Sequence, residues 1–138
     1  MSEENVETCR RAFEAGNNRN LDAFLKELHS EVEWHPAMSA LLGGSKTVYR
    51  GHDGVRRWWR DVTDALPEAE FEFPDIRDLG DRVVALGRLR ARGRVSGAET
   101  ETPFAYVVDL EDGTMVHVRA YRDHQEALEA AGLSESDT

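Results

Sequence analysis

The chain has 138 residues, of which 40% are hydrophobic and 32% are charged, a composition typical of one globular domain. Its formal net charge of −10 argues against nucleic acid as a partner, because phosphates are repelled by it at long range. Its single cysteine, Cys9, excludes an internal disulfide and is consistent with a reducing cytoplasm.

The sequence also lacks the segments that direct a protein to membranes. The acidic N-terminus has no apolar core of a signal peptide. No apolar run approaches the roughly 20 residues of a membrane-spanning helix. We therefore expect a cytoplasmic protein with no membrane partner.

The N-terminal half is predicted to contain three helices, in which apolar residues recur three and four positions apart and form a stripe that faces a core. These predicted helices are Ser2–Ala15, Leu21–Leu28 and Asp53–Leu66. Between the second and the third, Glu31–His35 reads as a strand that Pro36 stops. Ala37–Val48 is predicted to be a covering loop.

The C-terminal half is predicted to form consecutive strands. Pro74 interrupts the first of them, which places that strand at a sheet edge or at a bulge. Asp112 and Gly113 form a tight-turn dipeptide between the last two strands. Asp123 should cap a short final helix, His124–Ala131. The predicted strands are Phe71–Leu79, Arg82–Ser96, Thr102–Glu111 and Thr114–Arg122.

Arginines recur from Arg82 to Arg94 along one predicted strand. They would form either a local basic stripe or a row that is balanced by carboxylates on the neighbouring strands. We favour the balanced row, in view of the strongly negative net charge.

The order of these elements and three segments, EVEWHP, YRGHDGVRRWW and VRAYRDHQEALEAAGL, resemble one superfamily. The chain is similar to nuclear transport factor 2-like proteins, in particular their SnoaL-like branch, which is related to polyketide cyclases and ketosteroid isomerases. The resemblance spans about residues 3–133. It implies an α+β cone around an apolar pocket, usually as a dimer, but no single reaction, because this fold hosts several activities and proteins with none.

The expected fold is therefore one SnoaL-like domain over residues 1–138. Three N-terminal helices would pack on a strongly curved, mostly antiparallel sheet of four to six strands. A short C-terminal helix would follow, with residues 133–138 as a frayed tail.

The resemblance also indicates where catalytic residues would lie. Ketosteroid isomerases have a proton-abstracting carboxylate at the end of the first strand, where this chain has His35. They bind the developing oxyanion with a Tyr and a protonated Asp, where this chain has Cys9 and approximately Ala105. Neither replacement donates a strong hydrogen bond, so steroid isomerisation by that mechanism is not expected.

His35 is the candidate catalytic residue. Its ordinary pKa of about 6.5 suits a general base, provided that the ring faces the cavity. Glu33 shares its face of the strand and could raise its pKa. Since Trp34 alternates with His35, one of the two should face the core and the other should not. The alternative is a histidine hydrogen-bonded at a strand end.

The predicted ligand pocket consists of aromatic residues, one apolar residue and one arginine near the predicted cone interior. Each of them has packing or structural pairing as its alternative role. Gly87, Ala91 and Ala105 are predicted to face inward and, being small, to leave space for a ligand. The predicted pocket residues are Trp34, Tyr49, Trp58, Trp59, Val118 and Arg122.

A homodimer is expected through the outer face of the sheet, where exposed aromatic residues beside arginines are typical of interfaces. His117 alternates with Val116 and Val118 and is assigned to this outer face. The predicted interface residues are Arg90, Phe104, Tyr106, Arg119 and Tyr121.

Two functions remain open. The chain could be a small enzyme that acts by proton transfer on an apolar, ring-containing metabolite, with His35 as the base. It could instead be a non-catalytic module for ligand binding or dimerisation. No cofactor or metal is expected, because the sequence contains no GxSxG, no phosphate loop, no HExxH and no His/Cys cluster at metal spacing.

Overall fold

The computed structural model describes residues 2–37, 48–66, 68–92 and 97–133. Most of the predicted loop Ala37–Val48, residues 93–96 of a predicted strand and most of the predicted tail lie outside these ranges. The described helices are α1 (Ser2–Asn17), α2 (Leu21–Lys26), α3 (Gly51–Ala65) and α4 (His124–Ala130). The described strands are β1 (Leu28–His35), β2 (Tyr49–Arg50), β3 (Glu70–Asp78), β4 (Arg82–Arg92), β5 (Glu99–Glu111) and β6 (Thr114–Tyr121).

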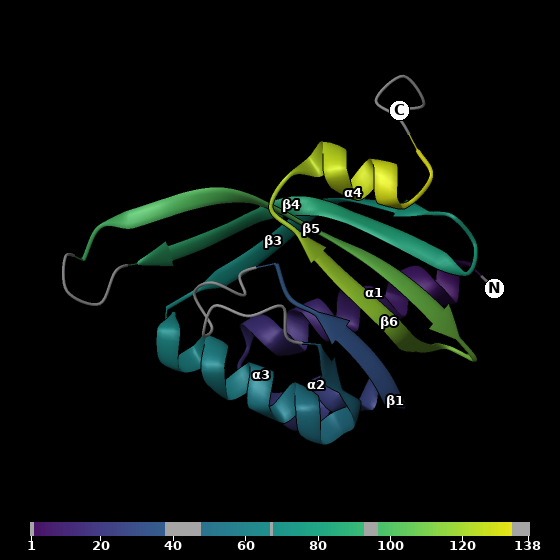
Figure 1. The fold of residues 1–138 in the computed structure, drawn as a ribbon, viewed down its shortest axis with the longest axis horizontal. Coiled ribbons are helices and arrows are strands. Elements are labelled where there is room, and N and C mark those ends of the chain that lie inside the picture. The colour runs from purple at the N-terminus through teal and green to yellow at the C-terminus, as the bar shows by residue number, and fades with distance from the viewer. Residues whose placement is uncertain (1, 38–47, 67, 93–96, 134–138) are drawn as a thin grey trace.

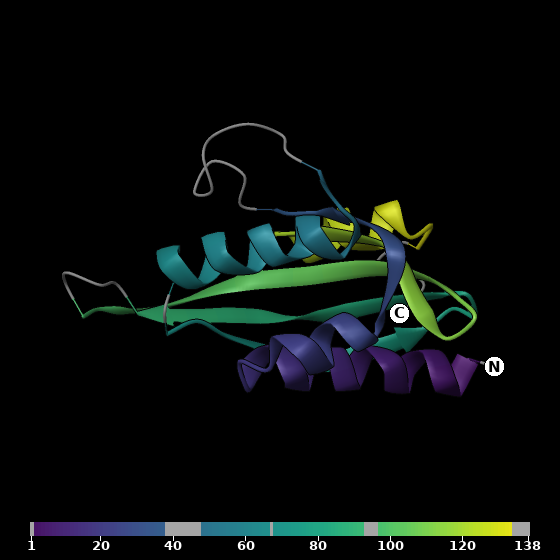
Figure 2. The ribbon, with the colours of Figure 1, turned by 90° about the horizontal axis from the view of Figure 1, so that it is seen from below.

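The strands form one curved sheet in the order β2-β1-β6-β5-β4-β3. Every neighbouring pair is antiparallel except β1 and β6, which are parallel. Helices α1, α2 and α3 lie on one side of the sheet and α4 on the other (Figure 1). Figure 2 shows α3 lying apart from the α1–α2 pair, so that strands of the sheet can be seen through the gap between the helices. The predicted α+β fold is thereby confirmed.

Local signals fix several element boundaries. The Asn20 side chain accepts a hydrogen bond from the Ala23 backbone and caps α2. Asp123 caps α4, as predicted, by accepting from the backbone N–H groups of Gln125 and Glu126. Asp112 and Gly113 take φ angles of 51° and 77°, the left-handed pair that a two-residue hairpin requires. No helix within the described part of the chain is long and apolar enough to cross a membrane.

The edge strand β3 contains the irregularity that Pro74 predicts. Glu72 pairs with Arg88 and Asp75 with Leu86, so Phe73 and Pro74 together face Gly87 alone. A Cβ at Gly87 would lie 1.7 Å from the Glu72 carbonyl oxygen. The missing side chain of Gly87 therefore makes room for the backbone of β3, not for a ligand as the sequence suggested.

The two faces of the sheet bury different clusters. The face under α1, α2 and α3, here called the inner face, holds the larger core. All five phenylalanines, all three tryptophans and Tyr106 belong to it or pack against it. On the opposite, outer face, α4 covers a smaller cluster that includes Val84, Leu86 and Val107.

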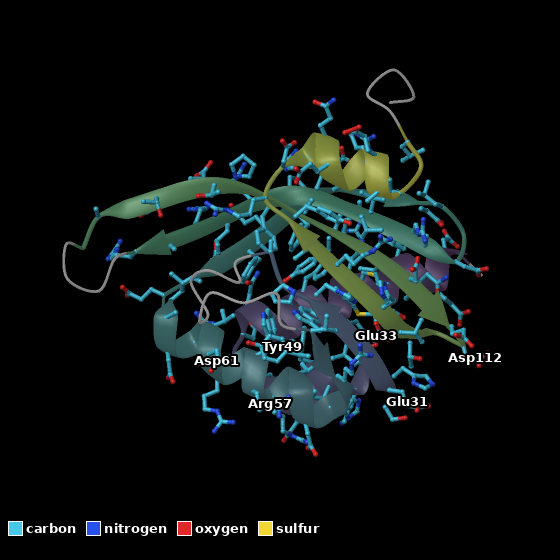
Figure 3. The ribbon with its side chains drawn as sticks, viewed as in Figure 1. Glu31, Glu33, Tyr49, Arg57, Asp61 and Asp112 are labelled. Carbon is cyan, nitrogen blue, oxygen red and sulfur yellow. The ribbon has the colours of Figure 1, made fainter. Side chains whose placement is uncertain are left out.

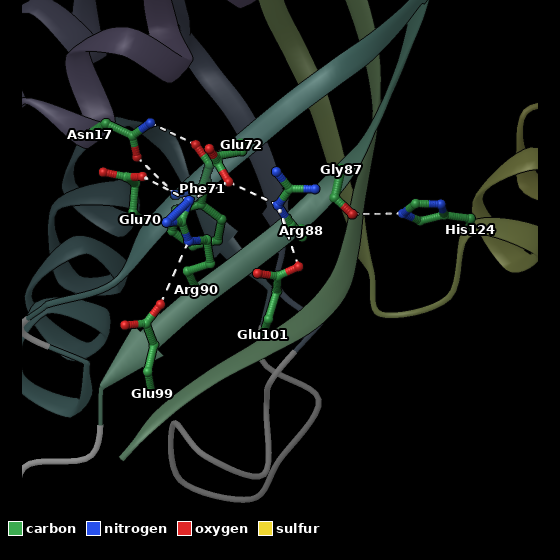
Figure 4. A network of polar contacts seen from close by, with 10 residues as sticks. All are labelled: Asn17, Glu70, Phe71, Glu72, Gly87, Arg88, Arg90, Glu99, Glu101 and His124. Atoms are coloured by element: carbon green, nitrogen blue, oxygen red, sulfur yellow. Dashed lines mark hydrogen bonds and ion pairs between the residues drawn. The ribbon is translucent and has the colours of Figure 1, made fainter. Parts of the chain in front are cut away.

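Beyond α4, the outer face carries alternating charges on β3, β4 and β5 (Figure 4). Glu72 accepts hydrogen bonds from both Arg88 and Arg90, at 2.9 Å each. These arginines hold the pKa of the Glu72 carboxyl below its usual range. Glu99 and Glu101 extend the pairing from β5. The prediction of a balanced row is confirmed for the arginines that the structure describes, from Arg82 to Arg92.

One face assignment from the sequence is wrong. Phe104 and Tyr106 were expected on the outer face with Arg119 and Tyr121, but both are buried in the inner core. The hairpin pairs Leu110 with Met115 and then Asp109 with His117, so Val116 is an extra residue. A one-residue bulge reverses the faces of all residues beyond it. Ala105 is shifted by the same bulge to the outer cluster.

Candidate functional site

A small cavity lies between the three N-terminal helices and the inner face of the sheet. Its volume is about 40 Å³, and a second cavity of about 10 Å³ adjoins the same aromatic residues. The cavity is walled mainly by rings from α1, α2, α3, β1, β3 and β5. These rings belong to Phe13, Phe24, Trp34, Trp58, Trp59, Phe71, Phe73 and Tyr106.

Trp34 is at the centre of this aromatic wall. Its ring centroid lies 4.4 Å from that of Trp58 and 5.6 Å from those of Phe24 and Tyr106. Trp34 is 1% exposed. Such tilted and edge-on pairs suit aromatic quadrupoles and rigidify the wall.

One buried hydrogen-bond donor of the wall has no acceptor within the described part of the chain, and a tyrosine hydroxyl lies on the same wall. The Trp34 Nε1–H is buried and has no hydrogen-bond partner among the residues that the structure describes. The ring of Tyr106 lies 5.6 Å from that of Trp34, and burial raises the pKa of Tyr106, so its hydroxyl stays protonated. An unpaired buried donor costs about 1–3 kcal/mol, which an incoming acceptor would recover.

The polar residues at the cavity are already engaged with the protein. Asn17 bonds to both the N–H and the carbonyl of Phe71, at 3.0 and 2.6 Å. Arg19 donates to the Ala69 carbonyl at 2.9 Å. Among the described residues that line the cavity there is no Asp, Glu, His or Lys, the side chains that usually transfer protons.

The thiol of Cys9, which the resemblance led us to compare with an oxyanion-hole residue, is not available as a nucleophile either. It is fully buried beneath the sheet and does not line the cavity. Burial raises the pKa of its thiol to about 12, so the reactive thiolate is absent at neutral pH.

The structure places only part of the predicted pocket at the cavity. Trp34, Trp58 and Trp59 line it. Tyr49 is buried, but its hydroxyl donates to Asp61 on α3 at 3.1 Å (Figure 3). Val118 lies in the closed core.

Arg122 was expected to point inward, and this is wrong. Strand β6 ends at Tyr121, and Asp123 already caps α4. Arg122 therefore lies in the turn between them and is exposed.

His35 does not face the cavity. Trp34 points inward, so His35 lies on the outer face, with Glu33 on the same strand. The condition under which His35 could act as a base inside the cone is therefore not met. Its contact with Glu33 does exist, with Nε2 3.4 Å from Oε1.

The outer face brings His117 to this pair. The His35 and His117 ring centroids are 4.7 Å apart. Burial lowers the pKa of His117, with further lowering from His35 and Arg119. Sequence reasoning missed this cluster, because it depends on the parallel pairing of β1 with β6, whose strands are about 80 residues apart in the chain.

Comparisons with known proteins agree with this fold. A family model described as "SnoaL-like domain" matches residues 9–118. An NTF2-like protein of unknown function from Burkholderia pseudomallei K96243 is 28% identical, with a TM-score of 0.79 over 94% of this chain and 97% of that one. A search of curated proteins finds no match.

Two more distant structures show the fold alone. TerC, crystallised with polyporic acid, is 23% identical, with a TM-score of 0.77 over 87% of this chain and 92% of that one. A candidate SnoaL-like polyketide cyclase from Jannaschia sp. CCS1 is 20% identical, with a TM-score of 0.76 over 89% and 88%.

Proposed function

The chain belongs to the SnoaL-like domain family, and from this premise we propose that it binds a small, apolar, ring-containing molecule inside the cone. The ligand carries an oxygen that accepts hydrogen bonds. The observation that supports this best is the unpaired Trp34 Nε1–H within an aromatic wall. The Tyr106 hydroxyl is the second available donor.

The chemistry of the wall selects the class of ligand. Aromatic rings on nearly every side favour a flat, apolar ring system through burial and ring stacking. A carbonyl or ether oxygen on that ring would accept from Trp34 and remove the cost of an unpaired buried donor. An anion is not favoured, because Arg19, the cation at the cavity, already donates to a backbone carbonyl.

The size of the cavity requires that the wall opens when a ligand enters. A volume of about 40 Å³ is well below the roughly 300–1,000 Å³ of a typical ligand pocket. Trp59, Phe71 and Phe73 are only partly buried, unlike Trp34. Rotation of these three partly buried rings would enlarge the cavity at less cost than movement of the fully buried ones.

Binding without catalysis fits this interior better than proton transfer. A general base must reach the substrate proton directly or through one water. His35 is on the other face of the sheet, and the described lining offers no carboxylate or imidazole. The ligand-binding module is therefore favoured over the proton-transfer enzyme.

A matched pair of compounds tests the Trp34 donor. Acetophenone and α-methylstyrene have nearly the same shape, but only acetophenone has an accepting oxygen. Trp34→Phe should weaken acetophenone binding about 3- to 10-fold, the worth of one hydrogen bond, and leave α-methylstyrene within about twofold. Equilibrium dialysis at high protein concentration measures both affinities.

Trp58→Phe is the control, since it makes the same change on the same wall without removing the unpaired donor. It should affect the two compounds equally. If Trp34→Phe also affects them equally, the assigned role of Trp34 is wrong. If neither compound binds the wild-type protein at millimolar concentration, the rings are a closed core and the chain is better described as a dimerisation module.

A homodimer through the outer face is also proposed, with the interface reduced to the predicted residues that remain there, Arg90, Arg119 and Tyr121. The buried Arg119 Nε has no hydrogen-bond partner among the described residues, and a carboxylate of a second copy would supply one. Sedimentation at micromolar concentration should give a dimer, and Arg119→Glu should shift it toward the monomer. A monomeric wild-type protein would contradict the proposal.

A further inference from the structure

We propose that Glu33, His35 and His117 form a binding site for a divalent transition-metal ion on the outer face of the sheet. The site lies on the opposite side of the sheet from the aromatic cavity and does not depend on the proposed ligand.

The fold brings these three side chains to one place. Glu33 and His35 are two residues apart on β1, so they point to the same face. Parallel pairing sets Glu33 beside His117 of β6. All three side chains are about one-third exposed, so an ion and a water could reach them.

The distances between the ligand atoms suit one ion. Oε1 of Glu33 lies 3.4 Å from Nε2 of His35 and 3.7 Å from Nε2 of His117. All three ligand atoms lie within 4.8 Å of one another. Tetrahedral bonds of about 2.0–2.1 Å place neighbouring ligand atoms about 3.4 Å apart, so small side-chain rotations complete the geometry.

Surrounding residues orient two of the three ligands. Arg50 donates to Oε2 of Glu33 at 2.9 Å and leaves Oε1 for the ion. Nδ1 of His117 is buried and has no hydrogen-bond partner in the described ranges, and it lies 3.8 Å from Asp109 Oδ2. An ion on Nε2 would keep a proton on Nδ1, directed toward Asp109, the arrangement that supports many metal-bound histidines. Arg82 holds Asp109 in turn, at 2.6 Å.

The ligand set indicates the kind of metal. Two imidazoles and one carboxylate suit zinc, cobalt or nickel and leave a fourth position for water. Magnesium and calcium prefer oxygen ligands and are not expected. Arg50 and Arg119 lie close by, and their positive charge should weaken the binding of a cation.

Zinc binding to the untagged, chelator-treated full chain tests the site. Isothermal titration should detect one Zn²⁺ per chain. His35→Ala and His117→Ala should each abolish this binding, and Glu33→Gln should weaken it strongly. Asp109→Asn should weaken it about 10- to 100-fold, as is usual when the partner of a metal-bound histidine is removed.

His29→Ala is the matched control. His29 lies on the same strand, where its Nδ1 accepts from the Glu31 backbone, and it is not part of the cluster. This variant should bind zinc as the wild type does, and circular dichroism should show that every variant is folded. Anomalous scattering from zinc-soaked crystals should place the ion between the three ligands. Absence of wild-type binding, or binding that survives His117→Ala, would overturn the proposal.

Discussion

Replacing Trp34 with alanine is expected to lower the free energy of unfolding by about 3–5 kcal/mol. The side chain is 1% exposed and contacts the rings of Phe24, Trp58 and Tyr106. Its removal would therefore leave a void that rigid neighbouring rings cannot fill. Because a domain of this kind is stable by roughly 5–15 kcal/mol, the variant should be close to unfolding. Urea denaturation followed by circular dichroism measures the difference.

Trp59→Ala is the control for this prediction. Trp59 is on the same wall but only partly buried, so its loss should cost clearly less than the loss of Trp34. If the two variants were equally stable, or if Trp34→Ala cost under about 1 kcal/mol, the indole of Trp34 would not be the centre of the inner core.

Replacing Gly87 with alanine is expected to cost about 3 kcal/mol, the upper end of the usual range for overpacking. The added methyl group would lie 1.7 Å from the Glu72 carbonyl oxygen, and backbone cannot rotate away as a flexible side chain can. β3 would have to leave its bulged position, which also displaces Phe71 and Phe73 from the cavity wall. Thermal and urea unfolding of the variant measure the loss.

Gly16→Ala is a matched control on α1. A Cβ at Gly16 would meet only Cδ1 of the Phe24 ring, at 4.0 Å, an ordinary van der Waals contact, so the change should be neutral or slightly stabilising. A Gly87→Ala variant as stable as wild type would show that β3 does not approach β4 closely at this point.

The sequence predicted the elements whose causes are local. Apolar spacing located the helices, Asp123 identified the cap of α4, and Asp112–Gly113 identified the hairpin turn. Pro74 correctly placed an irregularity in an edge strand. Each of these signals acts within a few residues of the chain.

The sequence-based predictions were wrong or incomplete where a structural feature depends on residues that are far apart in the chain. A bulge at Val116 on β6 reversed the expected faces of Phe104 and Tyr106, and the sequence has no turn or strand-breaking residue at that position. Gly87 was read as free space, because a sequence does not show that another backbone lies there. The cluster of His35 and His117 required the pairing of two distant strands, which local patterns do not encode.

The proposed hydrogen bond from Trp34 to a ligand oxygen inside the cone is tested most directly by NMR spectroscopy of the indole N–H groups. The chain has three tryptophans, so a ¹H–¹⁵N spectrum should contain three indole N–H signals, and Trp34→Phe identifies the one from Trp34. We expect acetophenone to move that signal downfield in a saturable way, and α-methylstyrene, which reproduces the ring-current effect without the oxygen, to lack this downfield component. A Trp34 signal that responds identically to both compounds, or to neither, would contradict the account.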